Sequence, residues 1–221
     1  MAKKLLVLLT VCVLLIPLTA CGNGAANNTN SPTAPLQSRQ TTDVTEPTQE
    51  ESITPQNTGG KEMKSLVVYF SWSGNTRAVA EEIQRQTNAQ IFEIVPESPY
   101  TDDYNALLDI AKGEQRNNAR PAIAGSVENL GEYDVVYLGF PNWWADMPMI
   151  VYSFLDEYDL SDKTVAPFCT SGGSGFSNTI SAIKSAEPDA TVLEGLHVRD
   201  GGASKSGKAV SDWLSKLNLA G

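Results

Sequence analysis

Apolar runs and amphipathic stretches alternate along the chain from residue 65 onward. Short runs rich in aliphatic and aromatic residues predict strands at 65–70, 90–95, 133–140, 164–169 and 191–198. Apolar residues at helical spacing predict helices over 75–87, within 99–118, and over 148–158, 176–186 and 204–217. Parallel strands need long crossover connections, which helices supply. The pattern therefore predicts a three-layer, doubly wound α/β domain with a parallel sheet.

The loops that follow the strands are the candidate site, because open α/β sheets bind ligands beyond the carboxyl ends of their strands. The first loop reads SWSGNT (71–76), and the loop after the third strand reads PNWWADMP (141–148). The fourth strand is followed by TSGGSG (170–175) and the fifth by RDGGAS (199–204). Three of these four loops are rich in glycine and hydroxyl residues.

The first loop has the chemistry of an anion site. Gly74 allows backbone N–H groups to converge, and Ser71, Ser73 and Thr76 supply hydroxyl groups. The following helix begins near Asn75, and its N-terminal dipole favours an anion. The lysine of a nucleotide-triphosphate loop and the GxGxxG fingerprint are both absent. On spacing alone, a plain strand-to-helix turn with a capping hydroxyl fits equally well.

The later loops suit a planar ligand. Trp143 and Trp144 lie in a loop rather than on a periodic face, so they could stack against a ring. The alternative is one core tryptophan with an exposed neighbour. Gly172, Gly173 and Gly175 let the backbone approach a ligand closely, or they form only a turn and a helix cap.

Composition narrows the class of protein. The chain has 221 residues, 41% of them hydrophobic, and a net charge of −10. This balance argues against nucleic acid as a partner, which would need a basic footprint. Cys169 is the one cysteine within the α/β region, so we expect no disulfide framework there. With His197 as the one histidine of the chain, we expect no metal site, and Cys169 is interpreted as a buried packing residue.

The first residues resemble an export signal. Lys3 and Lys4 precede an apolar run over 5–16 that is too short to span a bilayer, which takes about 20 residues. LTAC (18–21) resembles the bacterial lipoprotein box, which implies cleavage after residue 20 and a lipid on Cys21. An ordinary secretory signal with Cys21 as a bystander is the alternative.

Three regions follow from this N-terminal pattern. They are a lipoprotein signal peptide (1–20), a disordered polar tether (21–62) and a folded domain (63–221). We accordingly expect a lipid-anchored protein on the extracytoplasmic face of a bacterial cell membrane.

SWSGNT resembles the flavodoxin signature [ST]-x-[ST]-G-x-T, which it matches at Ser71, Ser73, Gly74 and Thr76. With PNWW and TSGGSG in the later loops, the chain is similar to short-chain flavodoxin-like proteins of bacteria from about residue 64 to the end. The resemblance implies a five-stranded parallel sheet of order 2-1-3-4-5 and non-covalently bound FMN.

The resemblance also implies a role for each loop. The FMN phosphate would be held by Ser71, Trp72, Ser73, Gly74, Asn75 and Thr76. The flavin ring would be flanked by Pro141, Asn142, Trp143 and Trp144. The ring's polar edge and the ribityl chain would be contacted by Thr170, Ser171, Gly172, Gly173 and Gly175. The ring loop departs from many flavodoxins because it lacks a glycine, and it carries Asp146, which we expect to lower the flavin potential.

The expected function is an FMN-binding redox protein that carries electrons between partner proteins at the membrane. One alternative is an NAD(P)H-dependent FMN or quinone oxidoreductase on the same fold, in which His197, Arg199 or Lys205 would meet substrate. A second alternative is a lipoprotein that binds a ligand without redox chemistry.

Overall fold

The computed structural model describes residues 63–219. The predicted signal peptide and tether, including Cys21, lie outside these residues. The main sheet consists of β1 (Ser65–Tyr69), β2 (Gln90–Glu93), β5 (Val135–Pro141), β6 (Thr164–Ser171), β7 (Thr191–Val192) and β8 (Leu196–Arg199). A second, two-stranded sheet pairs β3 (Val95–Pro96) with β4 (Ile123–Ala124). The helices are α1 (Asn75–Thr87), α2 (Tyr104–Arg116), α3 (Met149–Glu157), α4 (Thr179–Ala186) and α5 (Gly207–Leu217), with 3₁₀ turns η1 (Leu130–Glu132) and η2 (Asp200–Lys205).

The main sheet has the predicted order. Its strands run β2-β1-β5-β6-β7, with β8 also paired to β6, and every pairing is parallel. When the strands are numbered as the sequence predicted them, this order is 2-1-3-4-5. The three-layer, doubly wound prediction is confirmed.

The predicted fifth strand is divided into two pieces. β7 pairs with the start of β6 and β8 with its end, and the break between them lies beside Pro167. Val165 of β6 accepts a hydrogen bond from Leu193 on this side, so Pro167, two residues on, presents its ring nitrogen to the same side. Because proline has no N–H to donate, the ladder is interrupted here.

Several other boundaries also differ from the prediction. The strand expected over 90–95 ends at Glu93, and the chain then turns into the small antiparallel pair β3–β4. The loop expected over 199–204 is mostly the 3₁₀ turn η2.

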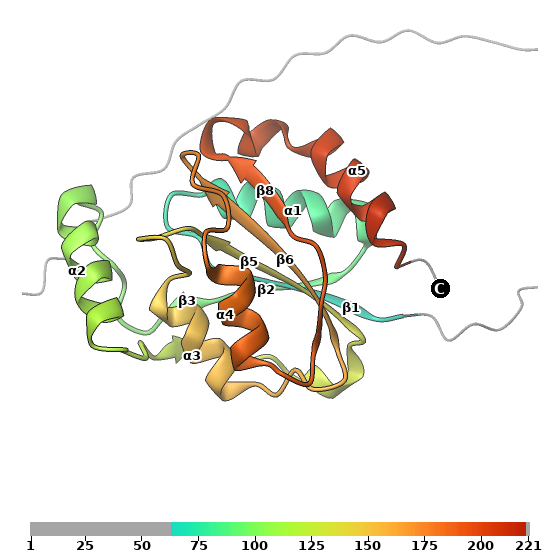
Figure 1. The fold of residues 1–221 in the computed structure, drawn as a ribbon, viewed down its shortest axis with the longest axis horizontal. Helices are drawn as coiled ribbons and strands as arrows, with labels where there is room; N and C mark the ends of the chain where they lie inside the picture. Colours follow the sequence, from blue (N-terminus) through green and yellow to red (C-terminus); the bar gives the residue numbers. More distant parts are fainter. Residues whose placement is uncertain (1–62, 220–221) are drawn as a thin grey trace, which may run out of the picture. The chain divides into compact units, whose positions relative to one another are not determined.

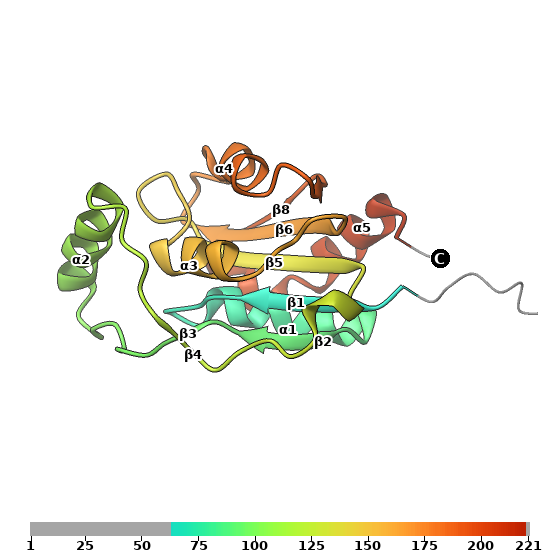
Figure 2. The same cartoon turned by 90° about the horizontal axis from the view of Figure 1, so that it is seen from below.

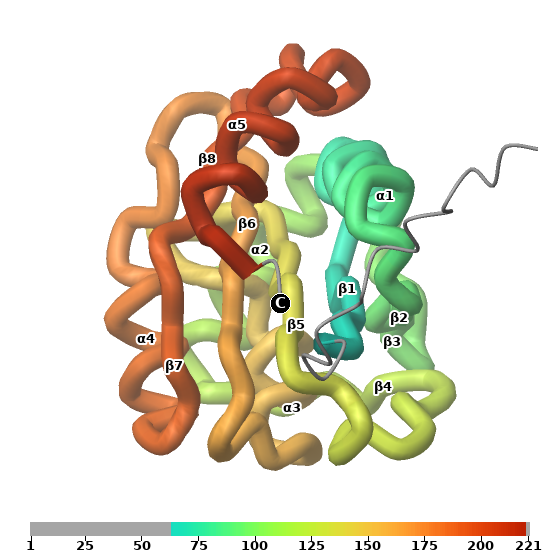
Figure 3. The backbone as a smooth tube through the Cα atoms, turned by 90° about the vertical axis from the view of Figure 1, so that its right-hand side faces the viewer, coloured from blue at the N-terminus to red at the C-terminus, as the bar shows by residue number. Residues whose placement is uncertain are grey.

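The two faces of the sheet bury different helices. Val67 and Tyr69 of β1 pack in one core with α1 and α5, while Leu66 and Val68 pack in a second core with α3 and α4. This alternation is the two-residue period of a strand. Figure 3 shows α1 and α5 on one side of the sheet and α3 and α4 on the other. Among residues 63–219, no helix has the length and apolar character needed to cross a membrane.

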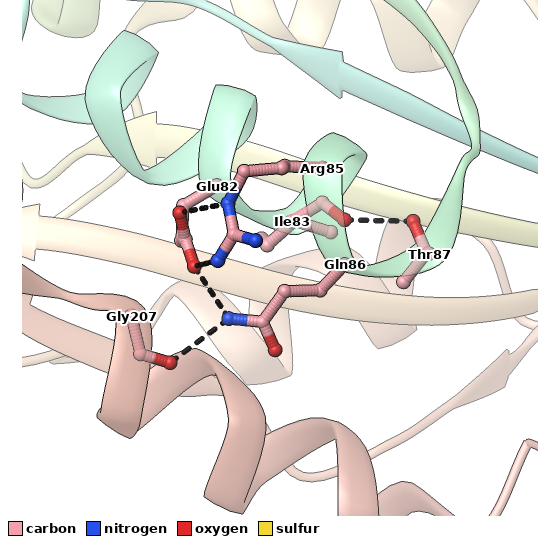
Figure 4. A network of polar contacts seen from close by, with 6 residues as sticks. All are labelled: Glu82, Ile83, Arg85, Gln86, Thr87 and Gly207. Atoms are coloured by element: carbon pink, nitrogen blue, oxygen red, sulfur yellow. Dashed lines mark hydrogen bonds and ion pairs between the residues drawn. The ribbon is translucent and has the colours of Figure 1, made fainter.

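The helix α1 is joined to α5 by polar contacts as well as by the core (Figure 4). Glu82 accepts hydrogen bonds from Arg85 and Gln86 of its own helix, and Gln86 Nε2 donates to the carbonyl of Gly207 at 2.9 Å. α1 is therefore fixed against both the sheet and its neighbouring helix.

The helix α2 belongs to neither covering layer. It stands beyond the carboxyl ends of the strands in both Figure 1 and Figure 2. Its buried residues, Leu107 and Ala111, are not part of the two main cores. α2 therefore stands at the end of the sheet where the loops that follow the strands lie.

Candidate functional site

A cavity of about 600 Å³ lies where β1, β5 and β6 end, and α2 forms its outer wall. It is lined by Trp72, Ser73, Asn75, Tyr104, Leu107, Leu108, Ala111, Pro141, Asn142, Trp143, Trp144, Thr170, Ser171, Gly172 and Asp200. Its volume is within the usual range for a small-molecule site, about 300–1,000 Å³. Of the predicted cofactor residues, Ser71, Gly74, Thr76, Gly173 and Gly175 do not line it.

The start of α1 is open for a ligand. Gly74 takes the N-cap position with φ 86°, and no side chain caps the helix. The N–H groups of Asn75, Thr76 and Arg77 open the helix and so have no acceptor within it. The hydroxyl of Ser71, in the same loop, is buried and has no hydrogen-bond partner. Unsatisfied donors and the positive end of a helix dipole therefore meet in one loop, as an oxyanion requires.

Thr76 joins the first loop to the glycine loop. Its hydroxyl lies 2.9 Å from the hydroxyl of Thr170, and both residues are buried. The carbonyl of Thr170 accepts a hydrogen bond from the N–H of Asn142 at 2.8 Å. The three loops predicted from the sequence are thus linked to one another, although Thr76 itself stands behind the cavity wall.

Gly175 is held by hydrogen bonds at both its N–H and its carbonyl. It supports the glycine loop without lining the cavity. Its N–H donates to Ser171 Oγ at 3.1 Å, and its carbonyl accepts from Asn142 Nδ2 at 2.7 Å. The Cys169 thiol also donates to that carbonyl. Burial, aided by the charge of Asp200, raises the pKa of Cys169 to about 12, so the thiol stays protonated. This environment matches a packing role for Cys169.

The two adjacent tryptophans have different surroundings. Trp143 packs edge-on against Phe70 and Tyr100, with ring centroids 5.5 and 5.6 Å away. Trp144 is 45% exposed and occupies the tip of a tight turn with Ala145, at φ 54° and 65°. Both central residues of this turn have left-handed backbone, which usually selects glycine or asparagine.

Trp144 leans on α2. Its Nε1 donates to the carbonyl of Leu108 at 3.1 Å, and the ammonium of Lys112 lies 4.8 Å from its ring centroid. Gln115 donates to the carbonyl of Trp144 at 3.4 Å. Trp144 therefore fixes α2 to the loop over 141–148. These contacts account for a strained, left-handed backbone at a residue that is not glycine.

Trp72 closes the other side of the cavity. Its Nε1 donates to the carbonyl of Thr101 at 2.9 Å, and its ring lies 6.2 Å from that of Tyr104. Trp72 thus lines the cavity and packs on the segment that leads into α2.

The wall formed by α2 was missing from the predicted site. Tyr104, Leu107, Leu108 and Ala111 give the cavity an apolar side. The helical period of 99–118 shows that α2 has an apolar face, but it does not show what that face covers.

The carboxylate in the cavity is not the expected one. Asp146 accepts hydrogen bonds from the hydroxyl of Tyr152 at 3.0 Å and from the N–H of Met147 at 2.8 Å, and it does not line the cavity. Burial, aided by the charge of Asp146, raises the pKa of Tyr152. Asp200, from the loop after the last strand, lines the cavity instead.

The nearest cation of α1 is already paired. Arg77, in the first turn, forms an ion pair with Glu93 of β2, and hydrogen bonding to Glu93 raises its pKa. An anion at this loop would therefore be held by backbone N–H groups and hydroxyls. Among the described residues, no group of three or more His, Cys, Asp and Glu side chains is arranged to hold a metal ion.

A doubly wound sheet of this order, with an uncapped helix start, aromatic residues and a glycine loop around one cavity, defines a flavodoxin-like protein. The chain belongs to the flavodoxin family, whose profile matches residues 64–217. No curated protein matches the sequence.

Solved structures give the same assignment. A candidate flavoprotein from Bacteroides eggerthii DSM 20697 is 36% identical, with TM-score 0.64, over 71% of this chain and 98% of that one. A second, from Bacteroides uniformis ATCC 8492, is 32% identical, with TM-score 0.63, over 69% and 98%. A flavoprotein from Lactobacillus acidophilus NCFM, solved in complex with FMN, is 26% identical, with TM-score 0.57, over 69% and 99%.

Proposed function

We propose that the chain binds FMN in this cavity and carries electrons between partner proteins while anchored to a membrane by a lipid on Cys21. The observation that carries the proposal is the open start of α1, where the hydroxyl of Ser71 is buried without a partner. The similar flavoprotein solved with FMN supports the choice of cofactor.

The residues of the cavity, together with the adjoining 71–76 loop, fit each part of FMN. The start of α1, with Ser71 and Ser73, would hold the phosphate through N–H and O–H donors. The tryptophans and the apolar wall of α2 would enclose the ring, while the loop around Ser171 would meet its polar edge. Bound FMN would supply the redox chemistry, and the protein would position it and exclude water. The Asp200 carboxylate would disfavour negative charge nearby and so lower the flavin potential.

The membrane anchor is proposed from the sequence. The apolar run over 5–16 and the LTAC at 18–21 support export and lipidation. Labelling cells that express the full chain with radioactive palmitate tests this part. Label is expected on the wild type and not on Cys21→Ser, and label retained by the variant would refute lipidation at this residue.

FMN binding is tested by adding the purified protein to a fixed concentration of FMN and measuring flavin fluorescence. Saturable quenching and a shifted flavin absorption spectrum are expected. Unchanged fluorescence at excess protein would refute the proposal, and binding of a different small molecule would then favour the ligand-binding alternative.

The outer wall of the cavity, formed by α2, supports a second function, that of an NAD(P)H-dependent FMN or quinone reductase. Tyr104 and Trp144 line the cavity and are 60% and 45% exposed, so they offer aromatic surface to an incoming apolar molecule such as a quinone. Anaerobic addition of NADH or NADPH to the FMN-loaded protein separates the two functions. Persistent yellow colour supports the electron carrier, whereas bleaching at catalytic rates supports an NAD(P)H-dependent reductase.

A further inference from the structure

His197, the one histidine of the chain, stands directly behind the glycine loop. It lies in β8, paired in register with Cys169 of β6, and its Nε2 is 2.8 Å from Ser171 Oγ. His197 does not line the cavity, whereas Ser171 does. The imidazole can therefore act on a ligand only through the loop.

The hydrogen bonds of Ser171 determine which atom donates. Its Oγ accepts from the N–H of Gly173 at 3.3 Å and from the N–H of Gly175 at 3.1 Å. A hydroxyl oxygen has two lone pairs and one hydrogen. If these two N–H groups occupy both lone pairs, the remaining Ser171 hydrogen is directed at His197. Nε2 of a neutral imidazole is then the acceptor, and Nδ1 carries its proton.

The contacts continue from Ser171 into the cavity. Gly175, held by Ser171 through its N–H, accepts from Asn142 Nδ2 through its carbonyl. Asn142, Ser171 and Gly172 all line the cavity. The shape of the polar side of the cavity thus depends on the acceptor that His197 provides.

We propose that His197 is a positioning residue: as a neutral imidazole it accepts the Ser171 hydroxyl and holds the 171–175 loop in its binding shape, and protonation of the imidazole releases that loop. The proposal rests on FMN as the ligand of the cavity. An imidazolium has a donor at each nitrogen and no lone pair, so the Ser171 hydrogen would lose its acceptor. FMN should therefore bind less tightly as the pH falls.

Of the titratable groups near His197, the imidazole is the one whose charge we expect to change. Leu196 and Val198, its neighbours in β8, belong to the core on the opposite face. On the face of His197 lie the protonated thiol of Cys169 and, further along, Arg199 and Asp200 at the end of β8 and the start of η2. Two helices cover this face: α3, which carries the exposed Asp156 and Glu157, and α4, whose one charged side chain is the exposed Lys184. Among these groups, only an imidazole ordinarily changes charge between about pH 5 and pH 8.

The tautomer can be measured directly, because one histidine gives one set of imidazole resonances. A long-range ¹H–¹⁵N spectrum of the ¹⁵N-labelled protein at pH 8 should show a protonated Nδ1 and an unprotonated Nε2. A proton on Nε2 would overturn the proposal. This measurement uses the protein without FMN, so it stands even if FMN does not bind.

The effect on binding is measured as the FMN dissociation constant between pH 8 and pH 5 for the wild type and for His197→Gln. The glutamine can accept the Ser171 hydrogen bond but does not titrate. The wild-type constant should rise by about fivefold more than that of the variant, the scale of one hydrogen bond. The variant also corrects for the FMN phosphate, which titrates near pH 6. Equal pH profiles for the two proteins would overturn the proposal.

Two further measurements separate the causes. His197→Ala should weaken FMN binding at pH 8 by about fivefold, and His197→Gln should restore it. Riboflavin, which lacks the phosphate, should show the same difference in pH profile between the wild type and His197→Gln. A pH effect that appears only with FMN would locate it at the phosphate and contradict the role of His197. Absence of FMN binding at every pH would refute the proposed function, while the tautomer would still test the hydrogen-bond assignment.

Discussion

The helices α1 and α2 are each 13 residues long, yet they are built for different tasks. α1 buries Val79, Ala80 and Ile83 against the sheet and is joined to α5. α2 buries Leu107 and Ala111 and is fastened to the loops mainly by polar contacts at its rim. α1 is therefore part of the hydrophobic core, whereas α2 lies outside the core and lines the cavity.

Capping of the two helices shows the reverse order: the weakly held helix has a capped N-terminus, and the firmly held helix does not. The weakly held α2 has a complete cap, because Asp103 accepts a hydrogen bond from the N–H of Ala106 at 2.7 Å. The firmly held α1 begins at Gly74 without a cap and beside the unpartnered Ser71 hydroxyl. An uncapped helix start beside a buried hydroxyl that has no partner indicates that something other than the protein satisfies these groups.

The largest expected effect tests the difference in packing. Ile83→Ala in α1 removes a fully buried side chain and should lower the free energy of unfolding by about 2–5 kcal/mol. Ile110→Ala is the matched change in α2, where the side chain is 41% exposed, and should cost under about 0.5 kcal/mol. Urea denaturation measures both, and similar losses for the two variants would contradict the comparison.

The next effect tests the open start of α1. Ser71→Ala removes a buried hydroxyl that lacks a partner in the protein, so the stability without FMN should stay the same or rise. FMN affinity should fall by about tenfold, because a donor to the phosphate is lost. Thermal unfolding and fluorescence titration measure the two quantities. A fall in stability with unchanged affinity would mean that the hydroxyl serves the fold. Ser181→Ala, at an exposed position in α4, serves as the control.

The capped start of α2 should respond in the reverse way. Asp103→Ala removes the cap and should lower the stability of α2 by about 1 kcal/mol. Hydrogen exchange in α2 should become faster, while exchange in α1 stays unchanged. Equal acceleration in both helices would show that they unfold as one unit, contrary to the comparison.

The smallest effect concerns Glu114 of α2, which accepts a hydrogen bond from Tyr100 at 2.9 Å. Burial raises the pKa of Glu114, so its protonated form is favoured in the folded state. The stability it contributes is present below the unfolded pKa and is lost as the pH rises through the folded pKa. Glu114→Gln keeps an acceptor for Tyr100 without the charge, so its melting temperature should be slightly higher than that of the wild type at pH 7. The two proteins should converge near pH 4, and a less stable variant at pH 7 would contradict this account.

The sequence was sufficient for the fold but not for every part of the site. Alternating apolar runs and helical periods predict the doubly wound α/β fold, because parallel strands need helical crossovers. The strand order was implied by the resemblance to flavodoxins. The break between β7 and β8 was missed because it depends on Pro167, which lies in the neighbouring strand. The pattern of one strand does not show which proline will lie beside it.

The loops of the site were predicted because the sequence itself shows which segments follow the predicted strands. The wall of α2 was not, because an amphipathic pattern does not identify what the apolar face covers. Asp146 was expected near the ligand from its place in the ring loop, yet its side chain turns to Tyr152, while Asp200 reaches the cavity from another loop. Side-chain direction within an irregular loop depends on contacts that the sequence does not display.

The most direct test of the central claim compares FMN with riboflavin, which differ by the phosphate alone. Fluorescence titrations of the purified protein at one pH and one salt concentration give both dissociation constants. If the open start of α1 holds the phosphate, FMN should bind at least about tenfold more tightly than riboflavin, and Ser71→Ala should reduce that ratio. Equal affinities for the two flavins, or no binding of either, would contradict the account.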